Sequence, residues 1–312
     1  MKITYRIEYA VARACLALLR AMPPAAASNF GGFLGRSIGP LLPPSAVAYA
    51  NLKVAMPELD ETARRRVVRG VWENLGRTVA ELPHLANLQR DTPSGPGFEV
   101  RNEHIIKRIA AEGGPVVFCS AHIGNWEFLQ MAAASLGLPF AGIYRAAANP
   151  LMNNLIQQLR GAAGARDQPL FSKGSTGARR AMAHIARGGR LALLVDQKMN
   201  DGIEARLFGL PAMTAPAAAA FALRVRCPVV CGHVERIGPA RLCLVAEEPL
   251  ELPDSGDRQA DIALLTQRIN DQLERWIRAR PESWLWLHRR WGKEVVQVKQ
   301  RKKKVRKEVF LF

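Results

Sequence analysis

The sequence has few of the residues and motifs on which metal and redox chemistry depend. Its five cysteines form no CxxC pair and lie mostly in apolar runs, where a free thiol behaves as a small hydrophobic side chain. Cys227 and Cys231 lie close to His233, but the alternation of a strand explains this spacing better than a metal site does. No glycine-rich phosphate-binding loop is present. We therefore expect no bound metal, no cofactor and a reducing compartment.

Long apolar runs are missing as well. No uninterrupted run of about 20 apolar residues occurs, so the sequence gives no clear signal for a membrane-spanning helix. Near the start of the chain Arg6, Glu8 and Arg13 interrupt the apolar residues, and this pattern excludes the continuous apolar region of a cleavable signal peptide. The sequence leaves open whether residues 1–44 cross a membrane or lie on its surface.

Acidic residues are heavily outnumbered. The chain has 27 Asp and Glu against 44 Lys and Arg, which gives a formal net charge of +17 and an isoelectric point near 10.4. Such a charge favours a polyanionic partner, and nucleic acid, an anionic membrane and an acidic carrier protein all qualify. With 312 residues, of which 48% are hydrophobic, the chain can bury the core of one large domain with or without a small appendage.

The first residues that stand out form a basic amphipathic pattern. Arg6, Arg13 and Arg20 recur at every seventh position, so a helix over residues 3–22 places them on one stripe. The opposite face carries Ile7, Val11, Cys15, Leu18 and Leu19. Such a helix can lie in a membrane interface with its arginines at anionic headgroups, or it can pack on the domain as an ordinary surface helix. Together with a second apolar stretch, it predicts membrane-associating helices over residues 1–44.

The rest of the chain alternates between strand and helix patterns. Strands are predicted over residues 115–120, 139–144, 190–195, 228–235 and 241–247, and helices over 60–82, 102–112, 126–136, 149–163, 175–187, 214–226 and 259–279. This alternation predicts an α/β domain over residues 45–293, with a mixed, mostly parallel central sheet that is flanked by helices.

The end of the chain is rich in tryptophan and basic residues. Residues 281–292 contain three of the six tryptophans together with Arg289 and Arg290. Indole rings next to arginines suit a headgroup region or a phosphorylated ligand, and simple core packing with a solvated arginine pair is the alternative. In the predicted basic tail, residues 294–312, seven of the nine residues from Lys299 to Lys307 are basic. This run suits either a solvated tail or a membrane-surface anchor.

The stretch from Phe118 to Glu127 is the best candidate for chemistry. It reads as the end of a strand, a turn of small residues and the start of a helix. His122 and Glu127 can face each other only if His122 lies in the turn and Glu127 in the first turns of the helix. A histidine with a nearby carboxylate can activate a hydroxyl group, because the imidazole takes the proton and the carboxylate fixes the tautomer. The alternative is a capping histidine with an unrelated surface glutamate.

An ordered set of motifs extends over nearly the whole chain. In chain order the motifs are Asn51-Leu52 with Met56-Pro57, Asn74-Leu75-Gly76 with Glu81, His122 to Glu127, Asp196-Gln197, Phe208-Gly209-Leu210-Pro211 with Thr214, and Trp284 to Trp291. Together they resemble the lipid A biosynthesis (late, secondary) acyltransferases, a branch of the lysophospholipid acyltransferase superfamily. The resemblance implies a fold similar to that of the glycerol-phosphate acyltransferases.

The resemblance also implies a reaction and its residues. An acyl carrier protein would donate a fatty acyl chain to a hydroxyl of a phosphorylated lipid A precursor, at the cytoplasmic face of the inner membrane and among its lipids. His122 would be the general base and Glu127 would orient it. Arg160 would stabilise an oxyanion or a phosphate, and Asp196 matches the strand-end aspartate of the family. The expected substrate contacts are Asn125, Arg145, Lys173, Arg289 and Arg290.

Two other functions remain open from the sequence. The same machinery could acylate another membrane glycolipid or a lysophospholipid, although the acid at Glu127 favours the lipid A branch, because glycerolipid-type relatives more often carry Asp there. From a different class, the basic tail and the tryptophan-arginine cluster suit a non-catalytic protein that binds membranes or nucleic acid. That function would give His122 and Glu127 no role, so we expect no nucleic-acid partner.

Overall fold

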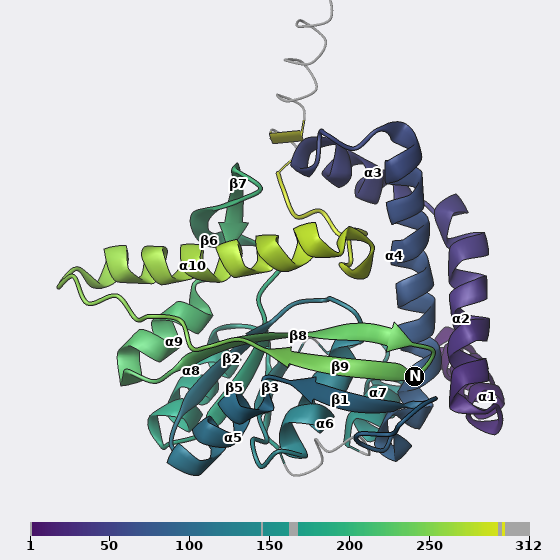
Figure 1. The fold of residues 1–312 in the computed structure, drawn as a ribbon, viewed down its shortest axis with the longest axis horizontal. Coiled ribbons are helices and arrows are strands. Elements are labelled where there is room, and N and C mark those ends of the chain that lie inside the picture. The colour runs from purple at the N-terminus through teal and green to yellow at the C-terminus, as the bar shows by residue number, and fades with distance from the viewer. Residues whose placement is uncertain (1, 145, 162–167, 293–294, 297–312) are drawn as a thin grey trace, which may run out of the picture.

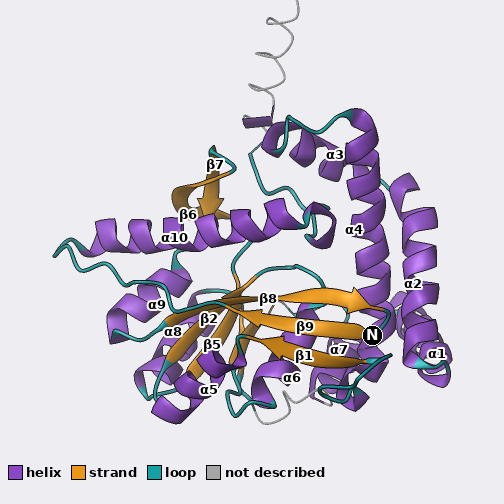
Figure 2. Cartoon of the chain, in the orientation of Figure 1, coloured by secondary structure: helices purple, strands orange, loops and turns teal. Residues whose placement is uncertain are grey.

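A seven-stranded, mostly parallel sheet forms the centre of the molecule in the computed structural model, which describes residues 2–144, 146–161, 168–292 and 295–296 (Figure 2). The strand order is β1-β9-β8-β2-β5-β3-β4, and only β8 and β9 pair antiparallel. The strands of this sheet are β1 Gly97–Arg101, β2 Val116–Ser120, β3 Ala141–Tyr144, β4 Leu170–Ser172, β5 Arg190–Leu194, β8 Val229–Gly238 and β9 Arg241–Ala246. A separate hairpin consists of β6 Lys198–Leu207 and β7 Leu210–Thr214.

Helices cover both faces of the sheet (Figure 1). They are α1 Ile3–Ala21, α2 Pro24–Ile38, α3 Pro44–Ala55, α4 Glu61–Glu81, α5 Glu103–Glu112, α6 Leu129–Ala134, α7 Pro150–Arg160, α8 Ser175–Ala186, α9 Ala217–Val225 and α10 Arg258–Ala279, with short 3-10 helices η1 Gly39–Leu41, η2 Leu82–Asn87, η3 Trp126–Phe128 and η5 Pro281–Ser283. The predicted α/β class and the mostly parallel sheet are thereby confirmed.

The central strand β2 shows why the sequence folds in this way. All five of its residues are buried, because helices lie on both of its faces. Val117 and Cys119 belong to the core layer that includes α9 and α10, whereas Val116 and Phe118 belong to the layer that includes α5 and α6. A strand that is buried on both faces needs a continuous apolar run rather than an alternating one, and this is the pattern that the sequence has.

The sequence patterns did not indicate five of the α-helices and strands. The helix α3, the strands β1 and β4 and the β6–β7 hairpin were not predicted. β4 has only three residues, and in β6 the alternation of apolar and polar residues is confined to Ile203–Leu207, after a register irregularity between Lys198 and Ile203, so both give a weak strand signal. β1 directly follows a segment rich in proline and glycine, which is typical of a junction between elements.

The N-terminal helices form a layer beside α4 (Figure 1). Two glycines allow α2 to pack closely on α4, since a Cβ at Gly31 would lie 2.4 Å from the carbonyl oxygen of Gly76, and one at Gly35 would lie 2.1 Å from that of Trp72. The predicted helix over residues 3–22 is confirmed as α1. In the described part of the chain, no helix combines the length and the apolar character that a membrane span requires. Apart from residues 295–296, the predicted basic tail lies outside the described residues.

The sheet brings the ends of several strands to one edge. β2 pairs with β5 from Val116 opposite Arg190 to Ser120 opposite Leu194, so the segments that follow these two strands leave the sheet side by side. β8 pairs with β2 only as far as Cys231 and then extends beyond the end of β2 as a hairpin with β9. One point at this edge of the sheet is therefore surrounded by three segments: the residues after β2, the residues after β5 and the part of β8 that extends beyond β2.

Candidate active site

The turn after β2 fixes the backbone of His122. The His122 N–H donates to Asp196 Oδ2 at 3.0 Å, and the His122 carbonyl accepts from the N–H of Leu285 at 3.0 Å. Two residues later Gly124 has a φ of +58°, and a Cβ at this position would lie 1.9 Å from the carbonyl oxygen of Val234. Only glycine fits here. As predicted, His122 precedes the helical turn η3, which carries Glu127.

The side chain of His122 is held by Asp196. Nδ1 of the imidazole lies 2.8 Å from Asp196 Oδ1, while Oδ2 accepts a hydrogen bond of 2.7 Å from Trp284 Nε1. Asp196 is fully buried, whereas 15% of the His122 side chain remains exposed. The imidazole also packs edge to face against Trp126, with 5.1 Å between ring centroids. The ring is therefore fixed in position, with part of its surface open to solvent.

The two pKa values of this pair shift in opposite directions. For Asp196, burial favours the neutral acid, but the charge and hydrogen bond of His122, aided by His288 and Trp284, hold its pKa well below the usual range. For His122, burial favours the neutral imidazole, but the charge and hydrogen bond of Asp196 outweigh it and raise the pKa. Asp196 is therefore ionised and accepts the Nδ1 proton, so Nε2 of neutral His122 is a free base.

Glu127 has a different partner. Its carboxylate accepts two hydrogen bonds from Arg160, from Nε at 2.7 Å and from Nη2 at 2.6 Å. The prediction that Glu127 orients the His122 ring is therefore wrong, because Asp196 makes that contact. The reason lies in the topology. Asp196 follows β5, which pairs with β2, so it lies beside the turn that carries His122. Glu127 lies after this turn, in η3, and faces Arg160 at the end of α7. The negative charge of Glu127 still contributes to the raised pKa of His122.

The structure thus brings together four predicted residues from four segments: His122 and Glu127 around the turn after β2, Arg160 at the end of α7, and Asp196 after β5. The hydrogen bond to Glu127 raises the pKa of Arg160, which keeps the guanidinium charged. Among the described residues, no acceptor contacts Arg160 Nη1, so this nitrogen can bind an oxygen of a ligand.

Two of the predicted substrate contacts are buried instead. Asn125 is fully buried and donates to Glu81 Oε2 at 2.8 Å, on the side of the turn that faces α4. Arg290 is fully buried as well; it donates to the carbonyl of Met213 at 2.9 Å and to Thr214 Oγ1 at 2.7 Å. Burial lowers the pKa of Arg290 to about 10. Both predictions are wrong, because these side chains satisfy the polar groups of the protein itself.

The remaining predicted contacts lie elsewhere. Lys173 follows β4 and is exposed, with its backbone N–H on the carbonyl of Tyr144. Arg289 is exposed next to buried Arg290. Arg145 lies outside the described residues. In the described ranges, no group of three or more His, Cys, Asp or Glu side chains is placed to hold a metal ion.

The tryptophan-rich segment contributes residues to the site that the sequence patterns did not assign. Trp284 holds Asp196, and His288 packs against Trp284 with ring centroids 5.3 Å apart. Burial lowers the pKa of His288, although the charge of Asp196 opposes this shift. Asn51 on α3 fixes the segment by donating to the carbonyls of Trp286 at 2.9 Å and of His288 at 2.7 Å. The sequence signals for these residues are the clustering of tryptophans near the end of the chain and the motifs that contain Asn51 and Trp284 to Trp291, and neither signal assigned these roles.

Comparison with known protein families gives a match over most of the chain. A family model described as bacterial lipid A biosynthesis acyltransferase matches residues 2–293, which include every residue of the site described above. A comparison with curated proteins finds no match.

Proposed function

The chain belongs to the bacterial lipid A biosynthesis acyltransferase family and is therefore an acyltransferase of lipid A biosynthesis; we propose that it transfers a fatty acyl chain from an acyl carrier protein thioester to a hydroxyl of a phosphorylated lipid A precursor. The observation that carries the proposal is the contact of 2.8 Å between His122 Nδ1 and buried Asp196. It leaves Nε2 as a base at a partly exposed position, where a hydroxyl group can approach.

In the proposed reaction His122 first accepts a proton from the acceptor hydroxyl and later donates it to the departing thiolate. Nε2 takes the proton of the acceptor hydroxyl while its oxygen forms a bond to the thioester carbonyl carbon. The C–S bond of the resulting tetrahedral intermediate then breaks, and the departing thiolate receives the proton from His122. Asp196 stays ionised and stabilises the imidazolium that exists between these steps. The products are the acylated lipid and the free thiol of the carrier protein, and His122 ends neutral, as it began.

Glu127 and Arg160 have a different part in this proposal. Because both carboxylate oxygens of Glu127 bind Arg160, the guanidinium is held rigidly and its Nη1 can point at substrate. A charged donor that is already in place stabilises the negative oxygen of the tetrahedral intermediate or a phosphate of the acceptor. The net charge of +17 favours both the phosphorylated acceptor and an acidic carrier protein.

The test is transfer of an acyl chain by the purified protein. We expect that incubation with an acyl carrier protein thioester and a lipid A precursor adds the mass of one acyl chain to the precursor, measured by mass spectrometry. His122→Ala should abolish this product. His104→Ala is the matched control, because His104 lies exposed on α5 and pairs loosely with Glu248 at 3.9 Å. Wild-type turnover in His122→Ala, or acylation only of a lysophospholipid supplied in the same assay, would contradict the proposal.

We also propose that the enzyme works at the inner membrane, on its cytoplasmic face. The support is an apolar surface on the two N-terminal helices, on which large side chains are exposed beside arginines. On α1 these side chains are Ile3, Ile7, Val11 and Leu18, and on α2 they are Phe30, Phe33, Leu34 and Ile38. An amphipathic helix of this kind can bury its apolar face among lipid chains while its arginines contact anionic headgroups.

Sedimentation with vesicles tests the membrane proposal. Replacing Ile7, Val11 and Leu18 together by serine should weaken binding to vesicles that contain phosphatidylglycerol by at least tenfold, since each apolar side chain contributes about 1 kcal/mol or more when it is buried. The control carries Ile237→Ser and Leu264→Ser, which remove exposed apolar side chains far from α1 in the sequence. If the triple variant binds vesicles as tightly as this control does, α1 is not the membrane-binding element.

A further inference from the structure

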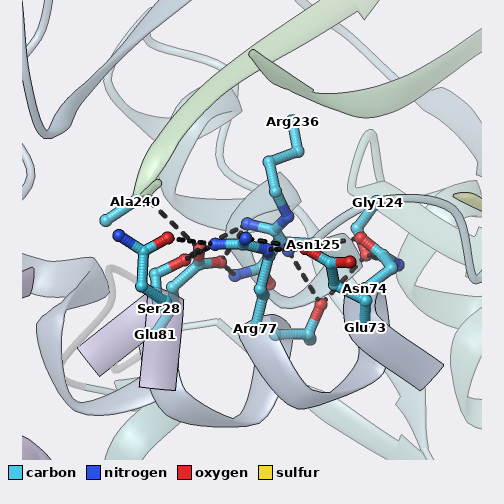
Figure 3. A network of polar contacts seen from close by, with 11 residues as sticks. Ser28, Glu73, Asn74, Arg77, Glu81, Gly124, Asn125, Arg236 and Ala240 are labelled. Carbon is cyan, nitrogen blue, oxygen red and sulfur yellow. Dashed lines mark hydrogen bonds and ion pairs between the residues drawn. The ribbon is translucent and has the colours of Figure 1, made fainter. Parts of the chain in front are cut away.

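The turn that carries His122 is also held on the side that faces α4. The carbonyl of Gly124 accepts a hydrogen bond from Asn74 Nδ2 at 2.9 Å (Figure 3). The same carbonyl accepts a second one from Thr78 Oγ1 at 3.1 Å. The Gly124 N–H donates to the carbonyl of Ser283 at 3.0 Å. Both polar groups of this peptide backbone are therefore fixed, two residues after the proposed base.

The next residue of the turn is held by a buried carboxylate. Asn125 Nδ2 donates to Glu81 Oε2 at 2.8 Å, and among the described residues Asn125 Oδ1 has no hydrogen-bond partner. Glu81 is fully buried at the end of α4, where its oxygens also accept from Ser28 Oγ at 2.6 Å and from the N–H of Ala240 at 3.2 Å. Glu81 thus joins the turn to α2, to α4 and to the β8–β9 hairpin.

Arg236 completes this network and determines which of its groups donate hydrogen bonds to the turn (Figure 3). Its Nη1 contacts both carboxylate oxygens of Glu81, which compensates the buried charge. Its Nη2 donates to Asn74 Oδ1 at 3.3 Å and to Thr78 Oγ1 at 3.2 Å. Because Asn74 uses its oxygen for Arg236, its amide nitrogen faces Gly124, and the Thr78 hydroxyl is likewise left to donate its proton to the turn.

The network is separate from the reacting groups. A pocket of about 420 Å³ lies beside it and is lined by Asn74, Gly124 and Arg236, but not by the side chains of the four active-site residues. The sequence motif Asn74-Leu75-Gly76 with Glu81 has no part in the proton transfer described above. Asn74 and Glu81 belong instead to the surface of α4 on which the turn rests, whereas Gly76 lies at the contact between α4 and α2.

We propose that the Glu81–Arg236 ion pair, acting through Asn74 and Thr78, positions the turn at Gly124 and Asn125 and thereby places the imidazole of His122 for proton transfer. These four are positioning residues, since the imidazole contacts Asp196 and Trp126 and none of the four. The inference rests on the proposed role of His122 as the general base. A displacement of the base by about 1 Å can lower a rate up to a hundredfold without weakening substrate binding, so the effect belongs in kcat and not in KM.

The first test removes a single hydroxyl from the network. Thr78→Val keeps the shape of the side chain and deletes the hydrogen bond to Gly124. Thr266→Val is the matched control, because Thr266 is also a buried helical threonine but donates to the carbonyl of Ile262 within α10. We expect kcat to fall about tenfold or more in Thr78→Val, with KM within twofold of wild type. The midpoint of thermal unfolding should be the same in Thr78→Val and Thr266→Val. Equal kcat values in the two variants would overturn the proposal.

The second test restores the missing cation. Arg236→Ala should lower kcat up to a hundredfold, and because Arg236 borders the pocket, millimolar guanidinium should enter and recover at least a tenth of the lost rate. Methylammonium at the same concentration should recover less, since it lacks the planar fork that contacts Glu81, Asn74 and Thr78. A wild-type kcat in Arg236→Ala, or a loss that guanidinium does not reverse, would count against the proposal. Absence of acyl transfer by the wild-type protein would contradict the proposed function instead.

Discussion

Two carboxylates lie close to His122, and they differ in burial and in partner. Asp196 is fully buried and contacts the imidazole of His122, which can gain and lose a proton. Glu127 is 16% exposed at its side chain and contacts the guanidinium of Arg160, which keeps its charge. The pair of His122 and Asp196 is therefore suited to proton transfer, because one member changes its charge during the reaction. The pair of Glu127 and Arg160 is suited to holding a permanent positive charge where the substrate becomes negative.

The largest expected effect is a difference in kcat between a variant of Asp196 and a variant of Glu127. Asp196→Asn keeps the size of the side chain but favours the wrong tautomer of His122, so we expect kcat to fall by about 10³- to 10⁴-fold. Glu127→Gln should cost less, since the His122 ring keeps its hydrogen bond to Asp196. Steady-state kinetics of the two variants, with circular dichroism to verify folding, provides the comparison. A greater loss of kcat in Glu127→Gln than in Asp196→Asn would assign the orienting role to Glu127 after all.

A smaller effect sharpens the role of the second pair. In Arg160→Lys the charge remains, but the two parallel hydrogen bonds to Glu127 cannot form. We expect about a tenfold loss of kcat/KM, with the pH dependence of the reaction unchanged. Full retention of kcat/KM by the lysine variant would show that only a positive charge is needed at this position and not a guanidinium of fixed orientation.

The sequence patterns predicted the parts of this site that depend on local structure. The apolar run before Phe118 and the small residues after it correctly predict a strand, a turn and a helical turn, with His122 ahead of Glu127. They could not show which carboxylate contacts the ring. That contact joins residues 74 positions apart and depends on the register between Ser120 and Leu194, which no local pattern encodes.

Burial was the second property that the sequence could not supply. Arg289 and Arg290 are identical in type and adjacent, yet one is exposed and the other is enclosed near the β6–β7 hairpin. Asn125 lies in the predicted turn, but its side chain faces the carboxylate of Glu81. In each case the long-range packing of elements decides whether a polar side chain serves a ligand or the protein, and two of these packing partners, β6 and β7, were not predicted at all.

The most direct test of the central claim is the pH dependence of kcat/KM in three proteins. For wild type, kcat/KM should rise with pH as His122 loses its proton, with a midpoint above the ordinary histidine value of 6.5, because Asp196 raises this pKa. Asp196→Asn should move the midpoint below 6.5, since burial then dominates and favours the neutral ring. Glu127→Gln should lower it by less. A midpoint that stays in place in Asp196→Asn but falls in Glu127→Gln would contradict the assignment of Asp196 as the partner of the catalytic base.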